Sequence, residues 1–163
     1  MRMSKLARNL ISVLENKTTR VHSTLILGPA GIGKSQVTQQ VTQYFNWPMI
    51  DIRLSQMDPV DLRGIPYVED VNGTKRTAWC PPSWLPDPVR DGPEGVLFLD
   101  EINGAPPAVA AAAYQLILDR ALGDYKVPPG WAIIAAGNNQ SDRGVTYTMP
   151  APLTNRFSVW QAE

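Results

Sequence analysis

Short runs of apolar residues alternate along the chain with longer segments in which apolar positions recur at helical spacing. The apolar runs predict buried strands at residues 23–27, 49–54, 96–99 and 131–136, with a fifth strand within residues 155–160. The segments with helical spacing predict helices at residues 4–15, 36–45 and 106–122. Wholly apolar strands that alternate with helices are typical of a parallel sheet covered on both faces, so the predicted fold class is α/β.

Shorter elements fill the intervals between these strands. Residues 58–64 predict a short helix, with Asp58 as its N-cap and Pro59 in its first position. Residues 67–79 alternate loosely around Asn72-Gly73, a dipeptide that favours a hairpin turn. We expect an irregular proline-rich segment at residues 81–93, a turn or short hairpin at residues 123–130, and a connector at residues 17–22.

Composition narrows the class of protein. The chain has 163 residues, which suits one domain over residues 1–163 with its own core. Its formal net charge is zero, which disfavours a non-specific nucleic-acid binder. Cys80 and His22 are the single residues of their types, so the sequence excludes an internal disulfide and a cluster of the usual zinc ligands. No apolar run approaches the length of a membrane span, and no signal-type stretch opens the chain, so we expect a cytoplasmic protein.

The loop at residues 28–35, with the sequence GPAGIGKS, fits the phosphate-loop pattern. Glycine permits a tight turn whose N–H groups point inward at an anion, and the helix expected next adds its positive end. Lys34 would be an exposed side chain that reaches the β- and γ-phosphates, and the Ser35 hydroxyl would hold magnesium. The alternative, an ordinary glycine-rich turn, is disfavoured by the strand before the loop and the helix after it. The expected phosphate-binding residues are Gly28, Pro29, Ala30, Gly31, Ile32, Gly33, Lys34 and Ser35.

Two adjacent acids, Asp100 and Glu101, follow the third apolar strand. Ligands bind at the carboxyl ends of strands in open α/β sheets, where these acids would emerge. Asp100 would hold magnesium and Glu101 would polarise a water for attack on the γ-phosphate, as in a Walker B motif. The alternative is a strand end that exposes two acids to solvent, and the phosphate loop in the same chain favours the catalytic interpretation.

Asn138 and Arg156 are further candidates near the ends of later strands. Asn138 follows the fourth apolar strand, where its amide would position the attacking water or touch the γ-phosphate; we prefer it to Asn139. The alternative for Asn138 is an asparagine that only forms a turn. Arg156 lies at the start of the fifth strand and would donate two hydrogen bonds to a γ-phosphate, the alternative being a surface arginine or an ion-pair partner.

The order of these motifs resembles that of the AAA+ ATPases from about residue 24 to residue 157. The closer similarity is to the MoxR-type branch. Residues 58–64 look like that branch's segment after the second strand, and residues 100–107 are similar to its DEINRAPP stretch, with Gly104 in place of arginine. Residues 153–157, with the sequence LTNRF, are similar to its LDRF stretch.

This resemblance implies a P-loop NTPase core of five parallel strands in the order 5-1-4-3-2, flanked by helices, with the hairpin at residues 67–79 as an insert. It also implies assembly into rings, usually hexamers, with active sites between subunits. Each nucleotide would then be bound by one subunit, through Lys34, Ser35, Asp100, Glu101 and Asn138. Arg156 of the neighbouring subunit would act on the same nucleotide as an arginine finger. The family's helical lid, which carries the sensor 2 arginine, would follow the fifth strand and is not present in this chain.

The function that the resemblance implies is Mg²⁺-dependent ATP binding and hydrolysis by an ATPase that remodels or activates a protein partner, with ATP and Mg²⁺ as cofactors. Relatives in the MoxR-type branch often work with a von Willebrand factor A domain protein, which makes such a protein a candidate client. One alternative is a nucleic-acid-associated ATPase or GTPase of a helicase or restriction system, which the zero net charge disfavours. Another is a non-hydrolysing, nucleotide-gated scaffold, which the water-activating Glu101 disfavours.

Overall fold

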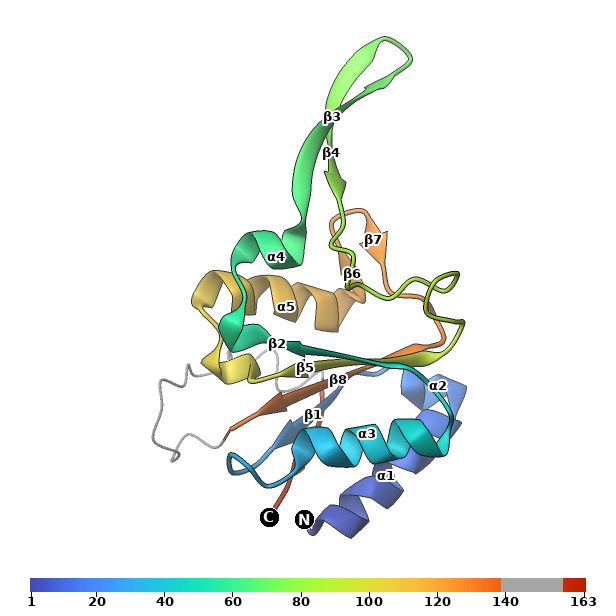
Figure 1. The fold of residues 1–163 in the computed structure, drawn as a ribbon, viewed down its shortest axis with the longest axis vertical. Helices are drawn as coiled ribbons and strands as arrows, with labels where there is room; N and C mark the ends of the chain where they lie inside the picture. The colour runs from blue at the N-terminus through green and yellow to red at the C-terminus, as the bar shows by residue number, and fades with distance from the viewer. Residues whose placement is uncertain (139–156) are drawn as a thin grey trace.

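The structure, a computed structural model, describes residues 1–138 and 157–163 of the chain. Its centre is a five-stranded sheet in which every neighbouring pair of strands runs parallel (Figure 1). In spatial order the strands are β2 (Met49–Arg53), β5 (Gly95–Asp100), β8 (Trp131–Gly137), β1 (Thr24–Leu27) and β9 (Ser158–Gln161). Numbered along the chain and read from the opposite edge, this is the predicted order 5-1-4-3-2, so the predicted fold class and strand order are confirmed.

Helices cover both faces of the sheet (Figure 1). One face carries α1 (Met3–Glu15) and α3 (Lys34–Tyr44), and the other carries α4 (Pro59–Arg63) and α5 (Pro107–Asp119). Two short 3-10 helices, η1 (Leu54–Gln56) and η2 (Ile102–Gly104), follow β2 and β5 at the carboxyl edge of the sheet. The two helical layers leave that edge open, and it is the edge where the candidate site residues lie.

Strand β5 shows why the central strands are apolar along their whole length. Leu97 and Leu99 pack with α5, whereas Val96 and Phe98 point to the opposite face and pack with α1 and α3. All four side chains are completely buried. Successive side chains of a strand point to opposite faces, so a strand covered on both sides has no position at which a polar side chain would meet water.

Two local expectations differ from the structure. Residues 17–22, expected to be a connector, contain the short helix α2 (Lys17–Arg20), whose N-cap Asn16 accepts a hydrogen bond from the Thr18 N–H. The helix expected over residues 106–122 ends at Asp119, because Arg120 adopts a left-handed backbone with φ of 52°. The chain then forms a small hairpin of β6 (Ala121–Leu122) and β7 (Tyr125–Lys126).

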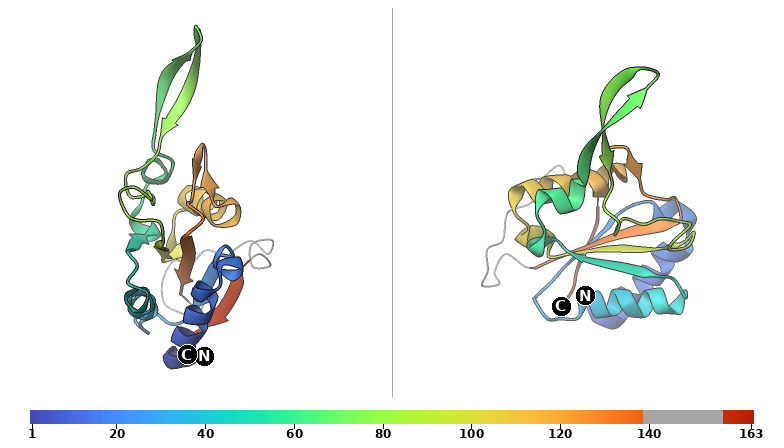
Figure 2. Two further views of the ribbon diagram at one scale, coloured as in Figure 1. Left: turned by 90° about the vertical axis from the view of Figure 1, so that its right-hand side faces the viewer. Right: turned by 45° about the horizontal axis from the view of Figure 1, so that its top comes forward.

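A long hairpin of β3 (Ile65–Val71) and β4 (Thr74–Cys80) projects well away from the sheet (Figures 1 and 2). Its turn is Asn72-Gly73, with φ of 55° and 81°, which is the backbone that a type I′ turn needs. The predicted hairpin and its turn are therefore confirmed. Among the described residues, no helix is both long and apolar enough to cross a membrane.

Candidate functional site

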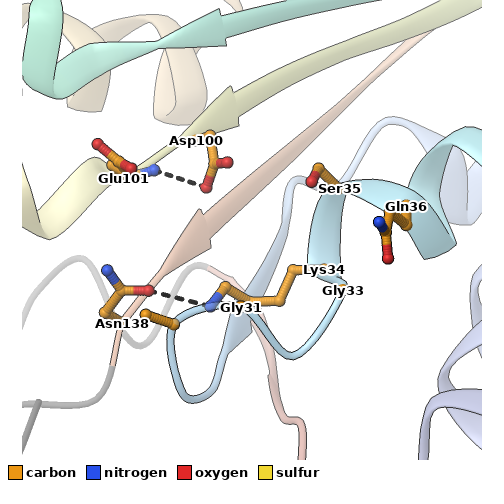
Figure 3. Close-up of a pocket in the computed structure, with 9 residues that line it drawn as sticks. Gly31, Gly33, Lys34, Ser35, Gln36, Asp100, Glu101 and Asn138 are labelled. Atoms are coloured by element: carbon orange, nitrogen blue, oxygen red, sulfur yellow. Dashed lines mark hydrogen bonds between the residues drawn. The ribbon is translucent and has the colours of Figure 1, made fainter.

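A pocket of about 180 Å³ lies at the carboxyl edge of the sheet, where β1, β5 and β8 end side by side. Its lining residues are Ala30, Gly31, Gly33, Lys34, Ser35, Gln36, Asp100, Glu101 and Asn138 (Figure 3). They come from three segments that are far apart in the sequence. The fold thus brings the glycine-rich loop, the paired acids and the asparagine into one pocket, as parallel strands that end at a common edge must do.

The loop from Gly28 to Gly33 connects β1 to α3. Gly33 is the N-cap of α3 and has φ of 97°, a conformation that glycine adopts without the steric cost of a side chain. At Gly28, a Cβ atom would lie 2.9 Å from the carbonyl oxygen of Ala162, so the chain can pass there only without a side chain. The loop therefore turns tightly and presents the N-terminal end of α3, with its positive dipole, to the pocket.

Lys34 lies inside this loop and not on its surface. Its side chain is only 7% exposed, which corrects the prediction of an exposed phosphate ligand. The Nζ atom donates hydrogen bonds to the carbonyl oxygens of Gly28 and Pro29, both at 2.9 Å, and to Oδ1 of Asn138 at 3.0 Å (Figure 3). The charge of Lys34 is thus held at the floor of the pocket by oxygens from two different strand ends.

Asp100 is the last residue of β5 and is partly buried beside the loop. Burial raises the pKa of its carboxyl group, and the neighbouring Glu101 carboxylate raises it further; the Glu101 N–H and the charge of Lys34 act in the opposite direction. The Glu101 N–H donates to Asp100 Oδ1 at 2.8 Å. A carboxylate in such surroundings gains from a nearby cation, so Asp100 suits a metal ligand.

Glu101 occupies a left-handed turn between β5 and η2, with φ of 56°. Its carboxylate accepts a hydrogen bond from the Ser55 hydroxyl, and its Oε1 lies 3.9 Å from Nε of Arg53. Neither partner of Glu101 was expected from the sequence. The expected strand order could have indicated Arg53, because it places the second and third strands side by side. Arg53 then lies opposite Asp100 in the register of β2 and β5, at the same edge of the sheet.

Asn138 directly follows β8 and reaches Lys34 with its side-chain oxygen, as described above. Its main chain is held by Asn103, whose side chain is 4% exposed. Asn103 Nδ2 donates to the Asn138 carbonyl at 2.6 Å, and the Asn138 N–H donates to Asn103 Oδ1 at 3.0 Å. In the sequence, Asn103 was noted only as part of the motif at residues 100–107, without a role of its own.

Two of the residues that the sequence analysis considered, Arg156 and Asn139, lie outside the described residues. Within residues 1–138 and 157–163, no three His, Cys, Asp or Glu side chains are grouped so that they would hold a metal ion. A Mg²⁺ ion commonly binds through one or two protein groups and completes its shell with water and phosphate oxygens. Ser35 and Asp100, which line the same pocket, fit that smaller role.

A protein family described as "AAA domain (dynein-related subfamily)" matches residues 23–157, which is most of the chain. The chain belongs to the AAA domain family. The matched range includes the phosphate loop, the paired acids and Asn138. It begins one residue before β1, the first strand along the chain. AAA domains are a family of ATPase domains, so the family assignment implies a nucleotide site in this chain.

Solved structures agree with this family in their fold. A "putative ATPase" from Cytophaga hutchinsonii superposes with a TM-score of 0.62 at 18% identity, over 97% of this chain and 45% of its own. NtrX from Brucella abortus superposes with a TM-score of 0.56 at 19% identity, over 96% of this chain and 35% of its own. NtrX in complex with ADP gives a TM-score of 0.54, with the same identity and coverage. The AAA domain described here thus spans less than half the length of each of these chains.

Proposed function

We propose that this AAA domain binds ATP with Mg²⁺ in the pocket at the carboxyl edge of the sheet and hydrolyses it. One observation carries the proposal: Lys34, Ser35, Asp100, Glu101 and Asn138 line a single pocket, although they come from three separate segments. An ordinary glycine-rich turn, or a strand end that only exposes acids to solvent, would not be expected to line one pocket together with the other groups. The reaction is the transfer of the γ-phosphoryl group to water.

Each group has a role that suits its place. The loop N–H groups and Lys34 bind the β- and γ-phosphates, while Ser35 and Asp100 hold the Mg²⁺ ion. Bound Mg²⁺ would neutralise charge on the phosphate oxygens. Glu101, at the rim of the pocket, accepts a proton from the attacking water, and Asn138 orients the γ-phosphate or that water.

The size of the pocket indicates which part of the nucleotide it takes. Pockets that enclose most of a small organic ligand have volumes of about 300–1,000 Å³, whereas this one measures about 180 Å³. Its lining is made of small, charged and amide-bearing residues. The pocket therefore suits the phosphates, and the base and sugar would lie outside it.

The finer proposal is that the domain is a MoxR-like motor that assembles into a ring. The ring would remodel or activate a protein client, such as a von Willebrand factor A domain protein. Three motif stretches support the MoxR-type branch: residues 58–64, 100–107 and 153–157. The projecting hairpin supports a protein client, because Tyr67, Val68 and other apolar side chains on it are exposed. We further propose that residues 1–163 act as one nucleotide-binding unit of a cytoplasmic protein.

Calorimetric titration of the purified chain with ATP, ADP and GTP, with and without Mg²⁺, tests the proposed function, together with a phosphate-release assay. We expect Mg²⁺-dependent binding of ATP and slow turnover. Binding without any release would favour a nucleotide-gated scaffold, a preference for GTP would favour a GTPase, and strong stimulation by DNA or RNA would favour a nucleic-acid enzyme. A chain that binds no nucleotide would refute the proposal.

A mixing experiment tests the proposed ring. An Arg156→Ala subunit would bind ATP in its own pocket but fail to hydrolyse it, since an arginine finger contributes about 10³-fold or more to the rate. A Lys34→Ala subunit would keep its finger but lose its own pocket. We expect mixtures of the two to regain activity, because each subunit supplies what the other lacks. An absence of rescue in mixtures that light scattering shows to be assembled would count against a finger between subunits.

A further inference from the structure

The main chain of Asn138 is held by a side chain and not by a neighbouring strand. The paired register of β8 with β1 ends at Gly137, and the register with β5 ends at Ala135. One residue later, both main-chain polar groups of Asn138 bond to the side-chain amide of Asn103, at 3.0 Å for its N–H and 2.6 Å for its carbonyl. The Asn103 amide thus substitutes for a strand partner at the point where the sheet ends.

Asn103 is itself fixed in place. Its side chain is 4% exposed, and it sits in η2 two residues after Glu101. A Cβ atom at Gly137 would lie 3.1 Å from Asn103 Oδ1 and 3.0 Å from Leu27 Cδ2, so only glycine leaves the amide room to approach without displacing a neighbour. A buried amide whose donor and acceptor are both satisfied is costly to disturb.

We propose that Asn103 is a positioning residue for nucleotide recognition: its amide holds the main chain of Asn138 and so directs the Asn138 side chain to the phosphate end of the pocket. This inference rests on the proposed function, since it concerns the same pocket. The direction is visible in the structure, where Asn138 Oδ1 lies 3.0 Å from Lys34 Nζ (Figure 3). The turn after β5 would therefore carry both Glu101 and Asn103, the residue that holds the main chain of Asn138.

Two substitutions separate this role from simple packing. Asn103→Ala removes both hydrogen bonds. Asn103→Asp keeps the shape and the acceptor but places a second oxygen opposite the Asn138 carbonyl, where a donor is needed. If Asn103 only filled space, the aspartate variant would behave like the parent; if it positions Asn138, both variants will be impaired. Ser23→Ala is a matched control, because Ser23 is also 4% exposed and donates to a main-chain carbonyl, that of Ile117.

The measurement is the affinity for ATP and for ADP of each variant and of the parent chain. Asn138 is proposed to contact the γ-phosphate or its attacking water, so its misplacement should weaken ATP binding by about tenfold, the effect of losing one hydrogen bond to a charged group. ADP binding should change less than about twofold, and Ser23→Ala should change neither. General loss of structure would instead weaken both nucleotides together.

A double-mutant cycle with Asn138→Ala completes the test. If Asn103 acts through Asn138, the double variant will discriminate ATP from ADP no worse than Asn138→Ala alone. Additive losses, equal losses for ATP and ADP, or an aspartate variant identical to the parent would each overturn the positioning role while leaving the proposed function intact. A parent chain that binds neither nucleotide would overturn both.

Discussion

The pocket and the β3–β4 hairpin are built in opposite ways. The pocket is lined by residues up to 108 positions apart, Ala30 to Asn138, and its polar groups bond across the segments that supply them. In the hairpin, by contrast, the interactions of side chains are local. The Arg76 guanidinium pairs with Glu69 directly across the ladder, and Asp70 accepts from the Gly73 N–H in the turn. Changes in the pocket should therefore affect distant partners, whereas changes in the hairpin should stay there.

The base of the hairpin is an intermediate case. Ala78 is buried, and the indole N–H of Trp84 donates to the Asp61 carbonyl beneath it. At Gly64, the backbone has φ of 80° and ψ of −162°, and a Cβ atom would collide with the Cys80 carbonyl oxygen. At the base of the hairpin, the backbone at Gly64 thus passes close to the backbone at Cys80, the last residue of β4. Beyond it, Val68 is 69% exposed. Matched substitutions in the two regions test this contrast.

The largest effect is expected for Glu101→Gln compared with Glu69→Gln on the hairpin. Glutamine keeps the shape of Glu101 and its contact with Ser55 but cannot accept a proton from water. A general base contributes about 10²–10⁴-fold to a rate, so hydrolysis should fall by about that factor while ATP binding is retained. Phosphate release and calorimetry measure the two quantities. Equal rates in Glu101→Gln and the parent would exclude Glu101 as the base, and a comparable loss in Glu69→Gln would remove the contrast between the regions.

A smaller loss, now in binding, is expected for Lys34→Ala compared with Lys75→Ala in the hairpin. Lys34 is proposed to bind two phosphates, and two hydrogen bonds between charged groups together contribute about 3 kcal/mol or more, which is about 100-fold in affinity. Lys75 should show no effect on ATP binding. Because Lys34 also bonds to the loop carbonyls, circular dichroism should accompany the titration. Unchanged affinity in a folded Lys34→Ala protein would remove the phosphate-loop assignment.

The same contrast explains what the sequence could and could not predict. The strands, the hairpin turn and the loop 28–35 depend on contiguous residues, so pattern and local chemistry identify them. The partners of Glu101 and the support of Asn138 depend on which strand ends become neighbours, and that information is spread over the whole sheet. The burial of Lys34 has the same origin, because Asn138, from a distant strand end, supplies an acceptor for its Nζ atom.

Helix α2 is a second case in which tertiary contacts outweigh the local signal. Four residues do not make a stable helix by themselves. Arg20 at its end is 5% exposed, pairs with Glu94 at 2.7 Å and lies 4.4 Å from the ring centre of Trp47. Trp47 lies 27 positions and Glu94 lies 74 positions from Arg20 along the chain. Residues 17–22 by themselves therefore gave no indication of a helix.

At the hairpin base, we expect Gly64→Ala to lower the free energy of unfolding by about 2 kcal/mol. Alanine is strained in a backbone region that is nearly exclusive to glycine, a cost of about 1–3 kcal/mol, and its Cβ would meet the Cys80 carbonyl. Urea denaturation followed by tryptophan fluorescence measures the change. A loss below about 0.5 kcal/mol would mean that the hairpin base moves aside freely and is not anchored to the body.

The smallest effect on overall stability is expected at the hairpin tip, for Gly73→Ala. The strain is similar in kind, since Gly73 has φ of 81°, but a Cβ atom there meets nothing within 4 Å. A left-handed alanine costs about 1–2 kcal/mol, which should open the turn locally and speed exchange of the Val71 and Thr74 amides by about 5–30-fold. The midpoint of urea unfolding should stay unchanged, because the residues next to the turn are exposed or only partly buried and lie far along the hairpin from the buried Ala78. If Gly73→Ala instead lowered that midpoint as much as Gly64→Ala, the hairpin would unfold together with the sheet, and the two regions would form one cooperative unit.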